Sequence, residues 1–163
     1  MDLGTILKVA HAVLGVWILA GLVGRWVTLG QASRSGDIAA VHTLLGLSAR
    51  FERIVVQVPT LVLPLGVGTA IAQGRPFLGP LQGAPVDWLF VSLVIYLSII
   101  PVIPLVFLPR GKVFAAALAE ATAAGVVTPE LSAAFRDQVV FAAHVYELAV
   151  IVAVFVLMIT KPF

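Results

Sequence analysis

The sequence predicts an all-α protein, a four-helix transmembrane bundle in which residues 1–163 form a single integral membrane domain. A helix needs ~20 residues to cross a bilayer. Four stretches of the chain are close to this length and contain at most one charged residue each. Composition agrees, because 61% of the residues are hydrophobic and only 11% are charged, whereas soluble domains average about 25% charged residues. Helices satisfy their own backbone polar groups in lipid, so unbroken apolar runs of this length indicate helices.

The predicted transmembrane helices cover approximately residues 5–28, 53–74, 87–108 and 138–160. The first contains the shortest apolar run, and it spans the bilayer if Lys8 and Arg25 extend their charged groups to the two interfaces. The second and third helices are interrupted by prolines, namely Pro59, Pro64, Pro101 and Pro104. These prolines indicate kinks tolerated by packing or, alternatively, a hinge or unwound segment that lines a binding cavity.

The distribution of basic residues predicts how the chain is oriented. Four crossings place both termini and the 74–87 loop on one side of the membrane. Seven basic residues lie on or near the opposite side: Arg25, Arg34, Arg50, Arg53, Arg110, Lys112 and Arg136. Three lie on the side of the termini: Lys8, Arg75 and Lys161. The positive-inside rule therefore predicts cytoplasmic 26–52 and 109–137 loops and extracytoplasmic termini, and it explains the net charge of +2 without a nucleic-acid partner.

Both cytoplasmic loops are predicted to contain short interfacial helices. The apolar residues of segment 36–53 recur at near-helical spacing, which predicts a helix on the membrane surface that runs into the second transmembrane helix. Residues 112–125 predict an alanine-rich helix that ends at Gly125, and Thr128 followed by Pro129 is typical of a helix start. The last helix is therefore expected to run unbroken from about residue 129 to residue 160.

Glu147 is the charged residue with the most costly predicted position, ten residues beyond Asp137 and fourteen before Lys161. At this depth its carboxyl group must be either protonated or paired. His144 lies three residues earlier on the same helical face. The candidate partners from the other helices are Gln57, Arg53 and Arg25. Two interpretations stay open: a structural hydrogen-bonded cluster, and a proton relay or ligand site.

His11 is the second unusual residue of the predicted membrane interior. It shares a helical face with Gly15, which leaves a flat space for a planar ligand or for another helix. Hydroxyl groups at a comparable predicted depth belong to Thr69, Ser92 and Tyr96. A buried histidine satisfied by these hydroxyls is one interpretation, and a haem ligand is the other. His11 and His144 should differ in depth by roughly 15 Å, so they are not expected to bind the same iron.

The sequence contains no complete catalytic set. Without cysteine it has no thiolate metal site and no iron–sulfur cluster. His42 lies in a predicted loop and is expected to be a surface residue. No metal-ligand cluster is predicted, the catalytic residues are unknown, and the chain is not predicted to be an enzyme.

Several segments carry a resemblance to known proteins. LKVAHAVLGVWILAGLVGR, the proline- and glycine-rich second helix and the ending VLMITKPF closely resemble a bacterial family of predicted four-helix integral membrane proteins with no assigned function. This resemblance covers essentially the whole chain and implies a multi-pass protein of the bacterial inner membrane. More distantly, the spacing from His11 to Gly21 with a tryptophan between them resembles the first helix of the copper-resistance D-type proteins and of the membrane protoporphyrinogen oxidase.

The distant resemblance carries an expectation about a cofactor. In the oxidase the first-helix histidine is understood to bind haem, so the resemblance implies haem b on His11. The match departs in places, since the third helix here has no lysine and Glu147 has no counterpart.

Three functional hypotheses follow. The first is a non-catalytic membrane subunit that packs in lipid against itself or against a larger complex through glycine-rich faces. The second is a haem-binding redox protein with His11 as axial ligand. The third is a proton-coupled carrier that uses His144 and Glu147, which the lack of inverted repeats makes the weakest of the three.

Overall fold

The computed structural model describes residues 2–163, and every regular element within that range is a helix. The α-helices are α1 (Leu3–Ala32), α2 (Ile38–Gln57), α3 (Pro59–Ala72), α4 (Trp88–Leu97), α5 (Leu108–Ala124), α6 (Pro129–Phe135) and α7 (Gln138–Thr160). A 3-10 turn, η1 (Gly79–Gln82), and a π-helical segment, η2 (Ile103–Phe107), complete the order. The all-α fold class is confirmed.

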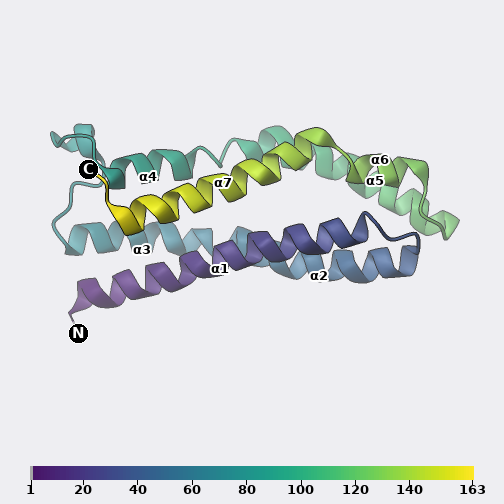
Figure 1. Cartoon of the computed structure of the whole chain (residues 1–163), viewed down its shortest axis with the longest axis horizontal. Helices are drawn as coiled ribbons and strands as arrows, with labels where there is room; N and C mark the ends of the chain where they lie inside the picture. The colour runs from purple at the N-terminus through teal and green to yellow at the C-terminus, as the bar shows by residue number, and fades with distance from the viewer. Residues whose placement is uncertain (1) are drawn as a thin grey trace.

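The helices form two elongated layers that share a long axis (Figure 1). In one layer α1 packs along α2 and α3, and in the other α7 packs against α4 and η2. The layers meet through α1 and α7. Both termini and the 73–87 segment lie at one end of the molecule, here called the terminal end (Figure 1). The 33–37 turn, α5 and α6 lie at the opposite end, here called the distal end (Figure 1).

Three helical stretches are long and apolar enough to cross a membrane. They are Leu3–Ala32, Ile38–Ala72 (α2 with α3) and Pro129–Thr160 (α6 with α7). Large apolar side chains such as Val16, Trp17 and Val156 are more than half exposed on these helices. A surface of this kind suits contact with lipid, whereas water would penalise it.

The third predicted transmembrane helix, residues 87–108, is not a single helix. α4 ends at Leu97 and η2 begins at Ile103, because Pro101 and Pro104 lack the N–H groups that would continue an α-helix. The backbone between them stays paired: the Val102 N–H donates to the Ile99 carbonyl at 3.0 Å, and the Ile103 N–H donates to the Ile100 carbonyl at 3.3 Å. Helical turns therefore carry the chain through the interruption, as a lipid environment requires.

The segment predicted as a surface helix is instead the first half of a long helical run. α2 and α3 are separated only by Val58, whose backbone angles are helical (φ −63°, ψ −37°). Together they cover 35 residues, about 52 Å at 1.5 Å per residue. α2 packs along α1 and so does not turn away across a membrane surface.

The second loop follows its predicted local signals, with one correction. α5 ends at Ala124, followed by Gly125 in the left-handed conformation (φ 71°), and the Thr128 hydroxyl caps α6 by accepting from the Leu131 N–H at 3.2 Å. The expectation of one unbroken helix from residue 129 to residue 160 is wrong. Asp137 has extended backbone angles and caps α7 with its side chain, so the chain bends between α6 and α7.

Two apolar clusters form the core. Ile18, Leu22, Val62 and Ile151 join the two layers in the middle of the bundle. A second cluster at the distal end holds α2, α5 and α6 together through Val41, Ala117, Ala121 and Leu131. The distal end is therefore packed by its own core, which leaves the region between the middle cluster and the terminal end as the place for a cavity.

Candidate functional site

A buried polar cluster joins three helices across both layers. Arg25 of α1 donates to Glu52 of α2 at 2.7 Å and also to Glu147 of α7. The side chains of Arg25 and Glu147 are only 6% and 7% exposed, whereas that of Glu52 is 47% exposed. The planar guanidinium group presents several donors in fixed directions, so a single arginine serves two carboxylates.

His144 borders this cluster and contacts η2. Its Nδ1 lies 3.4 Å from Glu147 Oε2. Its ring stacks on Phe107 with the ring centroids 5.0 Å apart, and the Arg25 guanidinium lies 5.8 Å from the same phenyl ring. Within residues 2–163 no buried side-chain nitrogen or oxygen atom lacks a hydrogen-bond partner. The cluster is therefore internally satisfied.

The predicted partners of Glu147 divide into two groups. The structure brings Arg25 and His144 to the carboxylate, and it leaves Arg53 and Gln57 exposed outside the cluster. Glu52 was missed, although it directly precedes Arg53 at the start of an apolar run. Adjacent residues of a helix point about 100° apart, so only one of these two can face α1.

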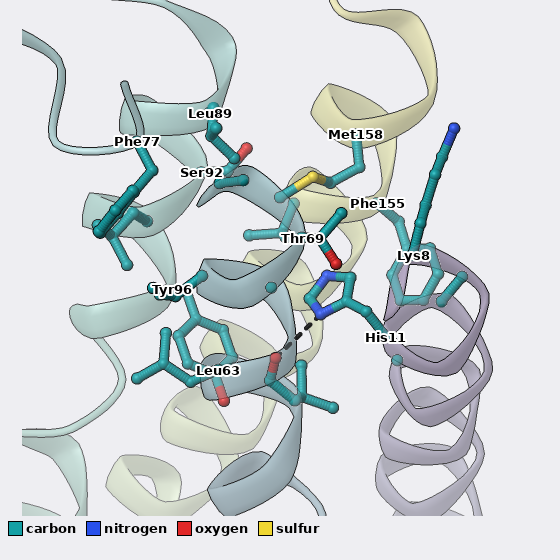
Figure 2. A pocket seen from close by; sticks show the side chains of 18 of the residues that line it. Lys8, His11, Leu63, Thr69, Phe77, Leu89, Ser92, Tyr96, Phe155 and Met158 are labelled. Atoms are coloured by element: carbon teal, nitrogen blue, oxygen red, sulfur yellow. Dashed lines mark hydrogen bonds between the residues drawn. The ribbon is translucent and has the colours of Figure 1, made fainter. Parts of the chain in front are cut away.

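A cavity of about 450 Å³ lies between the two layers, on the terminal side of the middle core cluster. Its walls come from α1, α3, α4 and α7 and are largely apolar, and Ile18, Val62 and Ile151 belong both to these walls and to the core cluster. A few polar side chains interrupt the walls: His11, Thr69, Ser92 and Tyr96 (Figure 2). The volume lies in the range of roughly 300–1,000 Å³ typical of small-molecule sites.

His11 is oriented by a backbone carbonyl. Its Nδ1 lies 2.9 Å from the Val62 oxygen, shown as a dashed line in Figure 2. Because a carbonyl oxygen only accepts, Nδ1 carries a proton, and in the neutral tautomer with this proton Nε2 keeps its lone pair. In Figure 2 the second ring nitrogen points away from this bond, toward the side of Thr69.

Of the three hydroxyl groups expected to satisfy His11, those of Thr69 and Ser92 are used within their own helices, and that of Tyr96 is not its partner either, because His11 bonds to the Val62 carbonyl. The Thr69 hydroxyl donates to the Leu65 carbonyl at 2.7 Å, and the Ser92 hydroxyl donates to the Trp88 carbonyl at 2.6 Å. Neither group has a second proton to give to His11. The interpretation of a histidine satisfied by hydroxyls is thus corrected, since its partner is the Val62 carbonyl and Nε2 stays available as a ligand atom.

Two glycines shape the cavity around His11. A Cβ atom at Gly66 would lie 2.8 Å from His11 Cε1, so only glycine leaves room for the imidazole in its present position. A Cβ atom at Gly15 would lie 3.2 Å from the Phe155 ring. Gly68, two residues after Gly66 on the same helix, has more space, with the nearest atom at 3.7 Å.

Three cations line the terminal end of the same cavity: Lys8, Arg75 and Lys161. The Arg75 guanidinium lies 5.6 Å and the Lys161 Nζ 5.5 Å from the centroid of the Trp88 ring, which is buried. Lys8 extends beyond His11 along α1 (Figure 2). In residues 2–163 none of these three cations forms an ion pair.

The three histidines occupy separate environments. His11 and Arg25 are fourteen residues apart on α1, about 21 Å at 1.5 Å per residue. Because Arg25 contacts Glu147 beside His144, His11 and His144 do not face one site. His42 is exposed, as expected, and its Nε2 lies 2.8 Å from the Thr122 hydroxyl. The described part of the chain has no group of three or more His, Cys, Asp or Glu side chains placed to hold a metal ion.

Comparison with known proteins agrees with this membrane architecture. No curated protein and no solved structure shows significant similarity to the chain. A family model described as "Predicted integral membrane protein (DUF2269)" matches residues 5–162, which is nearly the whole sequence. The chain therefore belongs to the DUF2269 family of predicted integral membrane proteins.

Proposed function

We propose that this protein binds haem b in the cavity between its two layers, with His11 as the only histidine ligand to the iron. The observation that carries the proposal is the bond from His11 Nδ1 to the Val62 carbonyl. Histidines that bind metals commonly donate their other ring N–H to a carbonyl or carboxylate, which fixes the ring and directs the remaining nitrogen to the metal. His11 has this arrangement and lines a cavity of suitable size.

The walls of the cavity suit a flat apolar molecule. Gly15 and Gly66 let the Phe155 ring and the His11 imidazole pack closely against the helices that form the walls, and most of the other lining residues are apolar. When bound, haem supplies one-electron redox chemistry or binds a diatomic ligand. The residues of this chain would hold the macrocycle, orient the imidazole through Val62 and exclude water.

The proposal includes the first hypothesis, that of a non-catalytic membrane subunit. Binding haem requires one ligating side chain, so a small protein of this kind would serve as a haem-carrying subunit of a homo-oligomer or a larger membrane complex. The geometry supports a structural role for His144 and Glu147 more than a carrier role, because Arg25 already engages the Glu147 carboxylate. Molecular mass in detergent, measured by light scattering, tests for a partner or second copy.

We also propose that the protein makes four crossings of a bacterial inner membrane with both termini outside. The support is the seven-to-three asymmetry of basic residues, together with two termini at one end of the bundle. Single cysteines introduced at position 2 and in α5 should react with an impermeant thiol reagent from opposite sides of the membrane. Labelling of the α5 cysteine from outside intact cells would reverse the orientation.

The absorption spectrum of the purified protein tests haem binding. Protein produced in haem-sufficient cells should show a Soret band that His11→Ala abolishes and His144→Ala retains. Gly66→Ala should weaken the band because the added methyl group displaces the imidazole, while the matched variant Gly68→Ala should retain it. The proposal fails if the wild-type protein binds no haem, or if the His11→Ala variant binds it with the same spectrum.

A further inference from the structure

We infer that the terminal end of the cavity is an anion subsite, and that its ligand is an amphiphile with an apolar body and one or two carboxylate groups. The subsite consists of Arg75 and Lys161, which lie at the Trp88 ring, and of Lys8, which lines the same cavity from α1. The inference rests on the proposed function in that both use the same cavity, and it adds the chemical class of the group that the cavity selects.

Positive charge is unbalanced at the terminal end of the cavity. Two of the cations approach one indole ring, at 5.6 Å and 5.5 Å from its centroid, so like charges are gathered at a single point. A cation–π contact offsets part of the cost of this arrangement. Within residues 2–163 no ion pair offsets the remaining repulsion between these cations. A bound carboxylate would offset it.

Two acids near this end of the chain's helices, Asp2 and Asp87, have other roles. Asp2 accepts from the Thr5 N–H at 2.7 Å and caps α1, and Asp87 accepts from the Phe90 N–H at 2.9 Å and caps α4. The hydrogen bond from the Thr5 backbone lowers the pKa of Asp2, in keeping with a charged cap. These carboxylates serve the helix ends and leave the cations at the cavity mouth free for a ligand.

The backbone of Lys161 has an unusual conformation. This residue has φ 45°, and it is the only residue other than glycine with a positive φ in the described chain. Its N–H still donates to the Leu157 carbonyl at 2.9 Å, so the left-handed turn ends α7 and places the ammonium group over Trp88. Glycine would relieve this conformation, and strained residues of this kind concentrate at ligand clamps.

The shape of the cavity determines which part of a ligand lies where. Ile18 and Lys8 both line it and are ten residues apart on α1, about 15 Å along the helix axis. An apolar body would thus lie against the core cluster and His11 while its acidic group reaches the cations. Haem combines an apolar body with an acidic edge in this way, because its two propionates lie on one edge, and a fatty acid also has an apolar body and an acidic end.

The test compares acids with their neutral esters on purified full-length protein in a non-ionic detergent. The first probe pair is haem b and its dimethyl ester, followed by the Soret band. The second pair is 11-(dansylamino)undecanoic acid and its methyl ester, followed by energy transfer from tryptophan. Each pair is titrated into the wild type, the triple variant Lys8→Gln/Arg75→Gln/Lys161→Gln, and the charge-matched control Arg34→Gln/Arg50→Gln/Lys112→Gln.

The wild type should bind each acid about tenfold or more tightly than its ester, since a charge-assisted contact is among the stronger hydrogen bonds. The triple variant at the cavity mouth should bind acid and ester equally, and the control should keep the preference. Equal binding of acid and ester by the wild type, or an equal loss in the control, would overturn the inference.

The two probe pairs separate this inference from the haem proposal. If neither porphyrin binds but the dansyl acid is preferred over its ester, the haem proposal fails and the anion subsite stands. If both porphyrins bind equally well, haem binding stands and the subsite falls. If no probe of either pair binds, the subsite is rejected.

Discussion

The polar cluster at Arg25 and the cavity at His11 both include residues of α1, but their polar and charged groups differ in how they are paired. In the cluster, one arginine binds two carboxylates and the buried polar atoms are all paired. At the cavity, Nε2 of His11 receives no proton from the neighbouring hydroxyls, and the three cations at the mouth form no ion pair in residues 2–163. Buried polar groups that are all paired stabilise the fold, whereas unpaired polar groups around a cavity are available to bind a ligand.

The packing of glycine differs in the same way. At Gly24 a Cβ atom would lie 2.5 Å from the Phe51 ring, so α1 and α2 touch closely near the cluster. At Gly66 a Cβ atom would meet the imidazole of His11, a side chain that lines the cavity. Close approach therefore serves helix packing in the first case and the placement of one side chain in the second.

The largest expected effect tests whether the cluster is structural. Glu147→Leu leaves the buried Arg25 with only the half-exposed Glu52 as partner, which should lower the free energy of unfolding by about 3–5 kcal/mol. Glu147→Gln should cost less, because the amide oxygen still accepts from Arg25. The measurement is equilibrium unfolding in mixed micelles at increasing SDS fraction.

The matched control for this pair is Glu52→Gln. Its side chain is 47% exposed, so we expect a loss of about 1 kcal/mol or less. If Glu147→Leu costs no more than Glu52→Gln, the cluster does not hold the layers together and the contrast with the cavity disappears.

A smaller effect is expected where α1 meets α2. Gly24→Ala places a methyl group against Phe51 and should destabilise the protein by about 1–3 kcal/mol. Gly30→Ala, on the same helix with no atom within 4 Å of the new Cβ, should instead stabilise it by about 0.5–1 kcal/mol. Thermal unfolding in detergent measures both, and equal shifts in the two variants would mean that the close approach has no energetic importance.

The smallest effect is expected at the walls of the cavity. Thr69→Val and Ser92→Ala remove hydroxyls that bond only to their own helices, so each should change the free energy of unfolding by less than about 1 kcal/mol. The same unfolding assay applies. A loss comparable to that of Glu147→Leu would show that these hydroxyls are structural and that the cavity is not a separate region.

The residues around Glu147 show which contacts could be predicted from the sequence. Its position inside an apolar helix already required a proton or a cation, and Arg25 was among the few candidates. The choice among Arg25, Arg53 and Gln57 depended on how each helix is rotated about its axis, which helical spacing within one segment does not reveal. The rotation of α2 likewise decides between the adjacent residues Glu52 and Arg53, of which Glu52 reaches Arg25 and Arg53 is exposed.

Hydropathy alone determined the apolar passes, and local signals such as Gly125 and Thr128 determined where helices end, because lipid and backbone geometry act on each segment separately. Tertiary structure decided the rest. The Val62 carbonyl that orients His11 and the cavity with its three cations both depend on segments far apart in the sequence. Their depth and rotation relative to one another are set by packing between helices, which a single sequence encodes only in combination.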